Sequence, residues 1–506
     1  MGPGAAGPLF HGRTVRGNAR RGAPLGDVMS DAELCYLTAT EALALFKARK
    51  LSPVELMKAV IARAEKVQPK LKPFTYMYFE EALDLARKAE AKYQKSGARL
   101  GALEGLPIAI KDESYIKGKP TSFGSLITKD FVPEVTSVNN QRLLKAGAIV
   151  HGRTATPEFS CASVTHSKLW GVTRNPWNPR YTVGGSSGGS GGALAAGATS
   201  LAMGSDIGGS IRIPASATGV VGYKPPYGRN PDDPPFNLDP YCHTGPMTRS
   251  VADAILVQNV ICGPSPTDIA SLRPKLKLPT DYQPIKGWKI AYSMDLTCFE
   301  VDKEVVANTK AALEVFKSLG ATVTEVDLKW GYAALKTGMD HLDHLFGTYL
   351  NKMAKKHAKI MTYYALDFAK QARKSTAADF LGAMEGAAKM YETFGPIMEQ
   401  HDVFICPTLA LPAVKADFLE TREELRINGK QSKLPAVLGW CMTTPFNTLS
   451  RCPVLAVPSG HAKNGVPTGI QIVGRTYSDA DVFRAGMAYE SAVGGWYRDA
   501  QHRPKL

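Results

Sequence analysis

Two clusters of glycine and serine are the stretches of the sequence best suited to chemistry. The first, GGSSGGS, covers residues 184–190, and the second, SDIGGSIRIP, covers residues 205–214. In the second cluster a serine on a tight glycine turn would present its hydroxyl outward, with successive backbone N–H groups pointing into the same space. Such N–H groups can bind a developing oxyanion, and removing one donor typically costs about 3 kcal/mol. Ser210 is therefore a candidate nucleophile for attack on a carbonyl carbon.

The first cluster has the glycine content of a phosphate-binding loop but lacks its other features. No Lys-Ser or Lys-Thr follows its glycines, and these are not spaced as GxGxxG between a strand and a helix. Two flexible loops would be the simplest structural interpretation of the clusters. Flexibility would not explain why the turn at residues 206–210 follows a strand-like run and leads toward a helix-like one. The pattern favours a nucleophile turn over nucleotide binding.

The elements that must hold these clusters alternate between short apolar runs and amphipathic stretches. Several runs are apolar throughout, as is typical of strands covered on both faces by helices. Strands are expected at 106–110, 148–150, 199–203, 289–292, 322–326, 403–406, 454–457 and 469–473. Between them, apolar residues recur at near-helical spacing, for example over 303–319. The alternation predicts an α/β fold with a mixed sheet between layers of helices.

Helix-start signals and helical patterns give four further expectations. Thr40 precedes an amphipathic stretch, and Ser52 precedes Pro53 and Glu55, an arrangement typical of a first helical turn. A helix is expected over about 80–94. Residues from about 330 to 400 show long helical patterns without strands, which we interpret as a helical insertion lying over the sheet.

Composition limits the classes of partner. The chain has 506 residues and a formal net charge of +15, but its Lys and Arg residues are scattered and form no basic stripe, so nucleic-acid binding is not expected. Eight cysteines without a CxxC pair favour free thiols and a cytoplasmic setting. No apolar run reaches 18 residues, so no membrane span is expected. Residues 1–30, rich in Gly, Ala, Pro and Arg, are expected to be a disordered or vector-derived leader, which leaves 31–506 as one domain.

The clusters resemble the signature of one enzyme family, the amidase signature family. GGSSGGS followed by SDIGGSIRIP matches the family pattern without a gap, and a Lys-Asp pair, Lys111-Asp112, ends an apolar strand upstream as in family members. Lys111 precedes Ser186 by 75 residues, and Ser186 precedes Ser210 by 24, which fits the family spacing. The resemblance covers nearly all of 31–506. It implies the fold of that family, a large mixed and twisted β-sheet covered by helices on both faces.

The resemblance also implies a role for each matched residue. Ser210 would be the acylated nucleophile. Ser186, which would follow a cis peptide bond, would be the proton relay. Lys111 would be the neutral amine that acts as base. A lysine at the end of an apolar strand suits this role because burial disfavours its charged form, although most such lysines lie on surfaces. The remaining matched positions are the oxyanion-hole N–H groups of Ile207, Gly208, Gly209 and Ser210, the acyl-pocket residue Ser160, and the structural residues Asp206, Arg212, Gly185 and Ser187.

Other chemistries have weaker support in the sequence. His341, Asp343 and His344 have spacing that suits a metal site, but no third distant ligand is indicated, so we expect neither a metal nor another cofactor. His243 is expected to pack or to form hydrogen bonds. A Ser-His-Asp triad is disfavoured because no GxSxG motif precedes a suitably placed histidine.

The expected function is that of a stand-alone amidase that cleaves an amide, anilide or carbamate bond. Such enzymes include fatty-acid amide hydrolases, aryl acylamidases, cyclic-amide hydrolases and urethanases, and esterase activity would be a side reaction. The first alternative is the glutaminase subunit of a tRNA-dependent amidotransferase, although Ile213 stands where such subunits usually carry Gln. The second is a catalytically silent binding protein on the same fold. Besides a small-molecule substrate, the only expected partner is a second copy of the chain in a homodimer.

Overall fold

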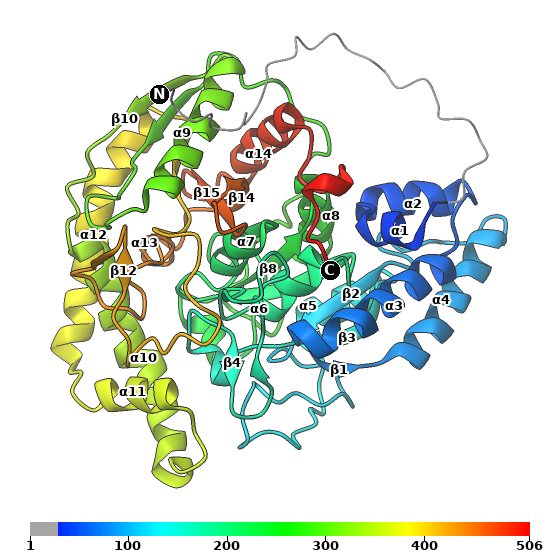
Figure 1. The fold of residues 1–506 in the computed structure, drawn as a ribbon, viewed down its shortest axis with the longest axis horizontal. Helices are drawn as coiled ribbons and strands as arrows, with labels where there is room; N and C mark the ends of the chain where they lie inside the picture. The colour runs from blue at the N-terminus through cyan, green and yellow to red at the C-terminus, as the bar shows by residue number, and fades with distance from the viewer. Residues whose placement is uncertain (1–28) are drawn as a thin grey trace, which may run out of the picture.

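The centre of the protein is one sheet of eleven strands, seen in a computed structural model that describes residues 29–506 (Figure 1). The leader expected at residues 1–30 lies almost wholly outside the described residues. Across the sheet the strand order is β1-β3-β2-β6-β8-β7-β14-β15-β11-β9-β10. These strands are β1 Phe74–Met77, β2 Pro107–Lys111, β3 Ile149–Thr154, β6 Leu201–Asp206, β7 Val221–Lys224, β8 His243–Thr248, β9 Lys289–Tyr292, β10 Thr322–Glu325, β11 Val403–Pro407, β14 Val454–His461 and β15 Pro467–Gly474.

The sheet is mixed, as predicted. β2 pairs in parallel with β3 and β6, and β9 pairs in parallel with β10 and β11. The other neighbours in the sheet are antiparallel, including the central run from β6 to β15. Two separate two-stranded sheets join β4 (His166–Ser167) to β5 (Gly171–Val172) and β12 (Arg426–Ile427) to β13 (Lys430–Gln431).

Helices surround the sheet on both faces. Along β11, Val403 and Ile405 point into one apolar cluster, whereas Phe404 and Cys406 point into another. Because side chains alternate between the faces of a strand, two clusters on one strand mean two covered faces. The described helices are α1 Asp31–Tyr36, α2 Ala39–Lys47, α3 Pro53–Leu71, α4 Phe79–Gln94, α5 Val138–Lys145, α6 Gly188–Ala195, α7 Arg212–Thr218, α8 Val251–Ile261, α9 Lys303–Ser318, α10 Ala333–His357, α11 Tyr363–Ala372, α12 Ala377–Glu399, α13 Pro445–Thr448 and α14 Asp479–Val493.

The strong start signal at Ser52 is confirmed. Ser52 caps α3 with its hydroxyl on the N–H of Val54, and its own N–H donates to the Glu55 carboxylate at 2.8 Å. The start expected after Thr40 is two residues late, because Thr38 is the cap of α2 and its hydroxyl accepts from the N–H of Glu41. The two neighbouring threonines offer the same capping hydroxyl, and only Thr38 has the glutamate three positions later that completes a capping box.

Every strand expected from an apolar run exists, although the bounds shift by a few residues. Three strands of the main sheet were not expected, β1, β7 and β8. β1 and β7 have only four residues each, and β8 contains Gly245 and Pro246, which normally argue against a strand. Such strands form because their neighbours in the sheet supply the pairing, which local sequence does not reveal.

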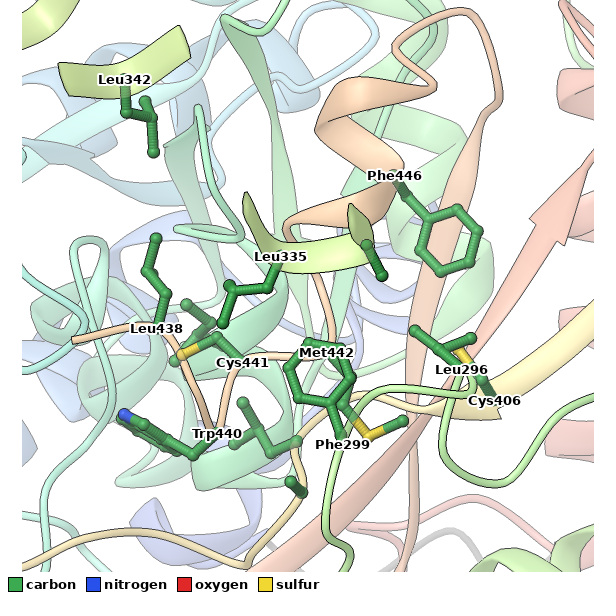
Figure 2. Packing of buried hydrophobic residues seen from close by; sticks show 14 of the residues in the cluster. Leu296, Phe299, Leu335, Leu342, Cys406, Leu438, Trp440, Cys441, Met442 and Phe446 are labelled. Atoms are coloured by element: carbon green, nitrogen blue, oxygen red, sulfur yellow. The ribbon is translucent and has the colours of Figure 1, made fainter. Parts of the chain in front are cut away.

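Helices α10 to α12 occupy the stretch where a helical insertion was expected, along one side of the molecule in Figure 1. Leu335 and Leu342 of α10 pack in one buried cluster with Leu438 and Trp440, as Figure 2 shows. The ring of Phe394 in α12 packs against the ring of Phe404 in β11, with 5.4 Å between the ring centroids. The helices therefore join the apolar core on one face of the sheet.

Two further properties concern the environment of the chain. None of the helices within residues 29–506 is long and apolar enough to cross a membrane. All eight cysteines are free thiols, and most are buried.

Candidate active site

Lys111 ends β2, the third strand from one edge of the sheet, and its side chain is 1% exposed. Its Nζ lies 2.7 Å from the Ser186 hydroxyl, 2.8 Å from the Ser205 hydroxyl and 3.2 Å from the Glu113 carboxylate. Burial lowers the pKa of Lys111, and the Glu113 carboxylate acts against this shift. The lysine and the first serine, 75 residues apart in the chain, thus form a buried hydrogen-bonded pair.

A neutral Lys111 amine can form a hydrogen bond with each of its three neighbours. A neutral amine has two N–H groups and one lone pair, whereas an ammonium group has three donors and no acceptor. The Glu113 carboxylate can only accept a hydrogen bond, and the Ser205 hydroxyl can accept a second one. When the neutral amine uses both N–H groups in this way, its lone pair is left for Ser186, and Lys111 can then take a proton from that hydroxyl.

The first glycine-serine cluster forms the loop that leads into α6. The peptide bond between Gly185 and Ser186 is cis, as the family resemblance implied. A Cβ on Gly185 would lie 2.6 Å from the carbonyl oxygen of Ala162, so only glycine fits there. The Ser187 N–H donates to the Ser210 carbonyl at 3.1 Å, and the Ser187 hydroxyl contacts the backbone of Ser205 at 3.3 Å. Ser187 therefore links the two clusters, whereas Gly185 lets the first cluster pack against the backbone of residues 162–164.

The second cluster forms the turn between β6 and α7. Among the described residues, the backbone N–H groups of 207–210 donate to no other protein group. The carbonyl of Gly208 accepts from the Thr443 hydroxyl at 2.8 Å and from the Thr444 hydroxyl at 3.1 Å, which fixes the peptide plane. Gly209 has φ +129°, and a Cβ on it would lie 1.9 Å from Thr443 Oγ1. Free donors around Ser210 are what an oxyanion requires.

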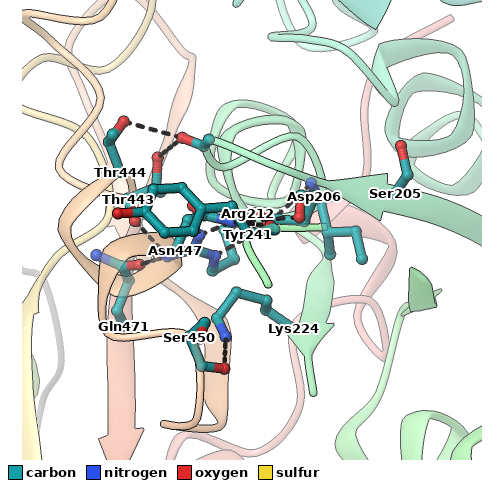
Figure 3. A network of polar contacts seen from close by, with 12 residues as sticks. Ser205, Asp206, Arg212, Lys224, Tyr241, Thr443, Thr444, Asn447, Ser450 and Gln471 are labelled. Atoms are coloured by element: carbon teal, nitrogen blue, oxygen red, sulfur yellow. Dashed lines mark hydrogen bonds and ion pairs between the residues drawn. The ribbon is translucent and has the colours of Figure 1, made fainter. Parts of the chain in front are cut away.

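Asp206 and Arg212 form a buried ion pair that anchors this turn (Figure 3). The guanidinium donates to both carboxylate oxygens at 2.9 Å, and neither side chain is exposed. Arg212 also donates to Gln471 at 2.6 Å and to Asn447 at 2.7 Å. Burial acts to raise the pKa of the Asp206 carboxyl. The charge of Arg212 and the hydrogen bonds that Asp206 accepts outweigh burial and hold this pKa below its ordinary value. The structural role of Asp206 and Arg212 stays a prediction, which this buried network supports.

Two adjoining cavities reach the serines. The larger, about 190 Å³, is lined by Ser186 and Ser205, and the smaller, about 30 Å³, is lined by Ser210 and Gly208. Ser160, Ile207 and Phe346 line both cavities. The expected substrate-binding residues Ser160, Ile207, Gly208 and Ser210 are therefore brought together, whereas Gly209 belongs to the turn and lines neither cavity.

Sequence reasoning missed several residues of this site. Glu113 accepts from the Ser160 hydroxyl as well as facing Lys111, and its place two residues after Lys111 was the available signal. Phe346 and Tyr349 of α10 line the larger cavity from a helix far away in the chain. Nothing local in their sequence distinguishes them from core aromatic residues.

The residues considered as metal ligands each interact with a different partner. His341 Nε2 lies 2.8 Å from an Asp239 carboxylate oxygen, and the His341 ring stacks on Tyr241 at 3.7 Å. His344 instead pairs with the Ser375 hydroxyl at 3.0 Å. In the part of the chain from residue 29 onward, no three His, Cys, Asp or Glu side chains are placed to hold a metal ion.

Comparisons with known proteins agree on one family. The family model described as Amidase matches residues 55–483. An acylamidase from Rhodococcus erythropolis is 33% identical over 487 residues, which span 92% of this chain and 98% of the relative. A glutamyl-tRNA(Gln) amidotransferase subunit from Thermosynechococcus vestitus is 32% identical over 490 residues, which span 90% and 97%. The crystal structure of a bacterial aryl acylamidase of the amidase signature enzymes matches with a TM-score of 0.83 at 29% identity, over 92% of this chain and 97% of that one.

Proposed function

The chain belongs to the amidase signature family and hydrolyses amide-type C–N bonds, and we propose that it does so through an acyl-enzyme on Ser210. The observation that carries this proposal is the pairing of Lys111 with Ser186 at 2.7 Å beside a turn whose four N–H groups donate to no acceptor in the described part of the chain. Residues 31–506 would form one amidase domain.

In the first half of the reaction, Ser210 attacks the carbonyl carbon of the amide. Ser186 takes the proton of the Ser210 hydroxyl and passes its own proton to the lone pair of Lys111. The carbonyl oxygen becomes an oxyanion, which the N–H groups of residues 207–210 stabilise. The proton then returns from Lys111 through Ser186 to the nitrogen, so that the C–N bond breaks and the amine leaves.

In the second half, water replaces the amine. The same Lys111–Ser186 pair removes a proton from water, which attacks the ester carbon of the acyl-enzyme. The oxyanion forms again in the same place, and collapse releases the acid and restores the Ser210 hydroxyl. The net reaction consumes one water and one amide and yields one acid and one amine.

The substrate would be a small amide, anilide or carbamate, with an esterase or urethanase side activity. The amidotransferase alternative has support from 32% identity to one subunit of such an enzyme. However, Ile213 at the position of the usual glutamine is buried in an apolar cluster of the core. A silent binding protein is disfavoured because the Lys111, Ser186 and Ser210 side chains are all present. We further propose a cytoplasmic enzyme without a nucleic-acid partner, acting alone or as a homodimer.

A hydrolysis screen tests this proposal. Wild type and Ser210→Ala are assayed against an anilide, an alkyl amide, a carbamate, an ester and glutamine. Hydrolysis of the anilide or alkyl amide by wild type alone is the expected result. Activity on glutamine alone would favour the amidotransferase alternative, and turnover that persists in Ser210→Ala would remove Ser210 from its proposed role.

A further inference from the structure

The proposed mechanism assigns the two cavities to the two halves of the substrate. Ser186 returns the proton to the departing nitrogen, so that nitrogen must lie beside the Ser186 hydroxyl, which lines the larger cavity. Ser210 carries the acyl group and lines the smaller one. The cavity of about 190 Å³ therefore receives the leaving amine, and the cavity of about 30 Å³ lies on the acyl side.

The walls of the larger cavity are acidic and aromatic. Four carboxyl residues line it, and no lysine or arginine from residues 29–506 does, although the chain has 61 Lys and Arg residues against 46 Asp and Glu. A cavity that drew its walls at random from this composition would contain more cations than anions. The acidic side chains are Glu113, Asp206, Asp232 and Asp233. The aromatic side chains are Tyr115, Phe123, Phe159, Phe236, Phe346 and Tyr349.

Three of the four carboxyl groups lack a permanent counter-charge. Asp206 is neutralised by Arg212, but the ion-pair partner of Glu113 is Lys111, which must be neutral when it acts as a base. Within residues 29–506, neither Asp232 nor Asp233 forms an ion pair. Asp232 accepts from the Thr244 hydroxyl at 3.1 Å, and Asp233 accepts from the Ser137 hydroxyl.

The environment of Asp232 shows the effect of this missing counter-charge. Burial, together with the neighbouring Asp233 and Glu113 carboxylates, raises the pKa of Asp232 to about 7. Burial also raises the pKa of Asp233. Carboxylates in such surroundings are stabilised by a cation placed among them, because its charge offsets both the desolvation and the like-charge repulsion.

Two buried polar atoms in residues of the same walls also have no hydrogen-bond partner within residues 29–506. Asn139 is 4% exposed, and its Nδ2 donates to the Pro231 carbonyl at 2.8 Å, which leaves Oδ1 without a hydrogen bond. The Nε2 of His243, another residue of the cavity wall, has no partner either. Burial and the nearby Lys224 and Arg212 hold the pKa of His243 well below its ordinary value, so the ring stays neutral. It therefore supplies no positive charge to the carboxylates.

From these walls we propose that the larger cavity is a subsite for a leaving amine that carries a second, protonated amino group. The preferred substrates are then monoacylated diamines, in which one nitrogen is acylated and the other is cationic. The carboxylates of Asp232 and Asp233 accept hydrogen bonds from the ammonium group, and the aromatic faces add cation–π attraction. A metal ion does not fit this role, because the described residues place no three ligating side chains together.

This inference rests on the proposed function, because the reaction decides which cavity holds the amine. The test uses three amides with one acyl group and different leaving amines, namely aminopentyl, hexyl and carboxypentyl. The aminopentyl and hexyl chains match in length, the carboxypentyl chain is one atom longer, and the three differ in charge. At mildly alkaline pH we expect kcat/KM for the aminopentyl amide to exceed that of the hexyl amide by about tenfold, with the carboxypentyl amide the poorest.

The ratio of kcat/KM for the cationic aminopentyl amide to kcat/KM for the neutral hexyl amide reports on the subsite, because both amides undergo the same chemistry. Asp232→Asn and Asp233→Asn should each lower this ratio toward one. Asp130→Asn is the matched control, since this aspartate is 87% exposed and lines neither cavity, and the ratio should stay unchanged. Circular dichroism establishes that each variant is folded.

The outcomes separate the subsite from the function. Hydrolysis of the hexyl amide with a ratio near one in wild type would overturn the subsite and leave the proposed function intact. If no amide is hydrolysed, the proposed function fails. The subsite is then tested by the binding of the aminopentyl and hexyl amides to Ser210→Ala in calorimetry. Tighter binding of the cationic amide supports the subsite, and equal binding overturns it.

Discussion

Replacing Glu113 with glutamine removes a negative charge beside Lys111 while keeping the size of the side chain and one acceptor oxygen. The Glu113 carboxylate favours the protonated form of Lys111 and so raises its pKa against the effect of burial. Lys111 acts as a base only when neutral, so activity is lost as the pH falls through this pKa. Glu113→Gln lowers the pKa, and the acid limb of the pH profile should therefore move to lower pH.

The distance of 3.2 Å between Lys111 Nζ and the Glu113 carboxylate sets the size of this shift. At this separation two unit charges attract by about 1.3 kcal/mol in water-like surroundings and by about 5 kcal/mol at an effective dielectric constant near 20. One pH unit corresponds to about 1.4 kcal/mol. The Glu113 side chain is 18% exposed, so solvent screens part of the attraction. We expect a shift of about one to two pH units.

The assay is kcat/KM for a neutral anilide from mildly acid to alkaline pH, in wild type and Glu113→Gln. The substrate itself does not titrate, so the acid limb reports the free enzyme. Glu314→Gln is the matched control, because this exposed glutamate pairs with Lys317 on α9. An unchanged midpoint, or one that moves to higher pH, would refute the idea that Glu113 controls the protonation of Lys111.

Three further changes test other parts of the site. Lys111→Ala should reduce kcat/KM for a p-nitroanilide more than for the matched p-nitrophenyl ester, because only the amine needs the returned proton. General acid–base catalysis typically raises a rate by a factor of about 10²–10⁴. Equal losses on both substrates would limit Lys111 to activating Ser210. Arg212→Met leaves a buried carboxylate unpaired and should lower the free energy of unfolding in urea by about 3–5 kcal/mol, whereas Arg422→Met, on an exposed pair, should cost under about 1 kcal/mol. Gly209→Ala should lower kcat/KM by about 10² or more in a folded protein, whereas Gly118→Ala, also at positive φ but in open space, should retain activity.

The sequence predicted the parts of the fold that depend on local pattern. Apolar runs such as 403–406 gave strands buried on both faces, and the Ser52 box gave the start of α3. The short strands β1, β7 and β8 were missed because their pairing comes from distant neighbours in the sheet. Local pattern carries no information about such partners.

The same distinction holds for the site. The glycine-serine clusters and Lys111 could be found from the sequence because glycine positions and motif spacing are local features. Their contacts were not predictable, since the Gly208 carbonyl is held by Thr443 and Thr444, more than 200 residues away. The cavity walls are also non-local: Asp232 follows β7 and Phe346 lies on α10, and only the fold places them together.

The central claim is that Ser210 becomes acylated, and covalent labelling tests it most directly. Wild-type enzyme is treated with a fluorophosphonate, residual activity is followed, and the adduct is located by peptide mass spectrometry. Ser210→Ala and Ser187→Ala serve as companion variants, the latter removing a nearby hydroxyl that is bonded to the backbone of Ser205. Loss of activity should coincide with one adduct on Ser210, present in Ser187→Ala and absent from Ser210→Ala. An adduct on another serine that accounts for the loss of activity, or full labelling of Ser210→Ala, would contradict this role for Ser210.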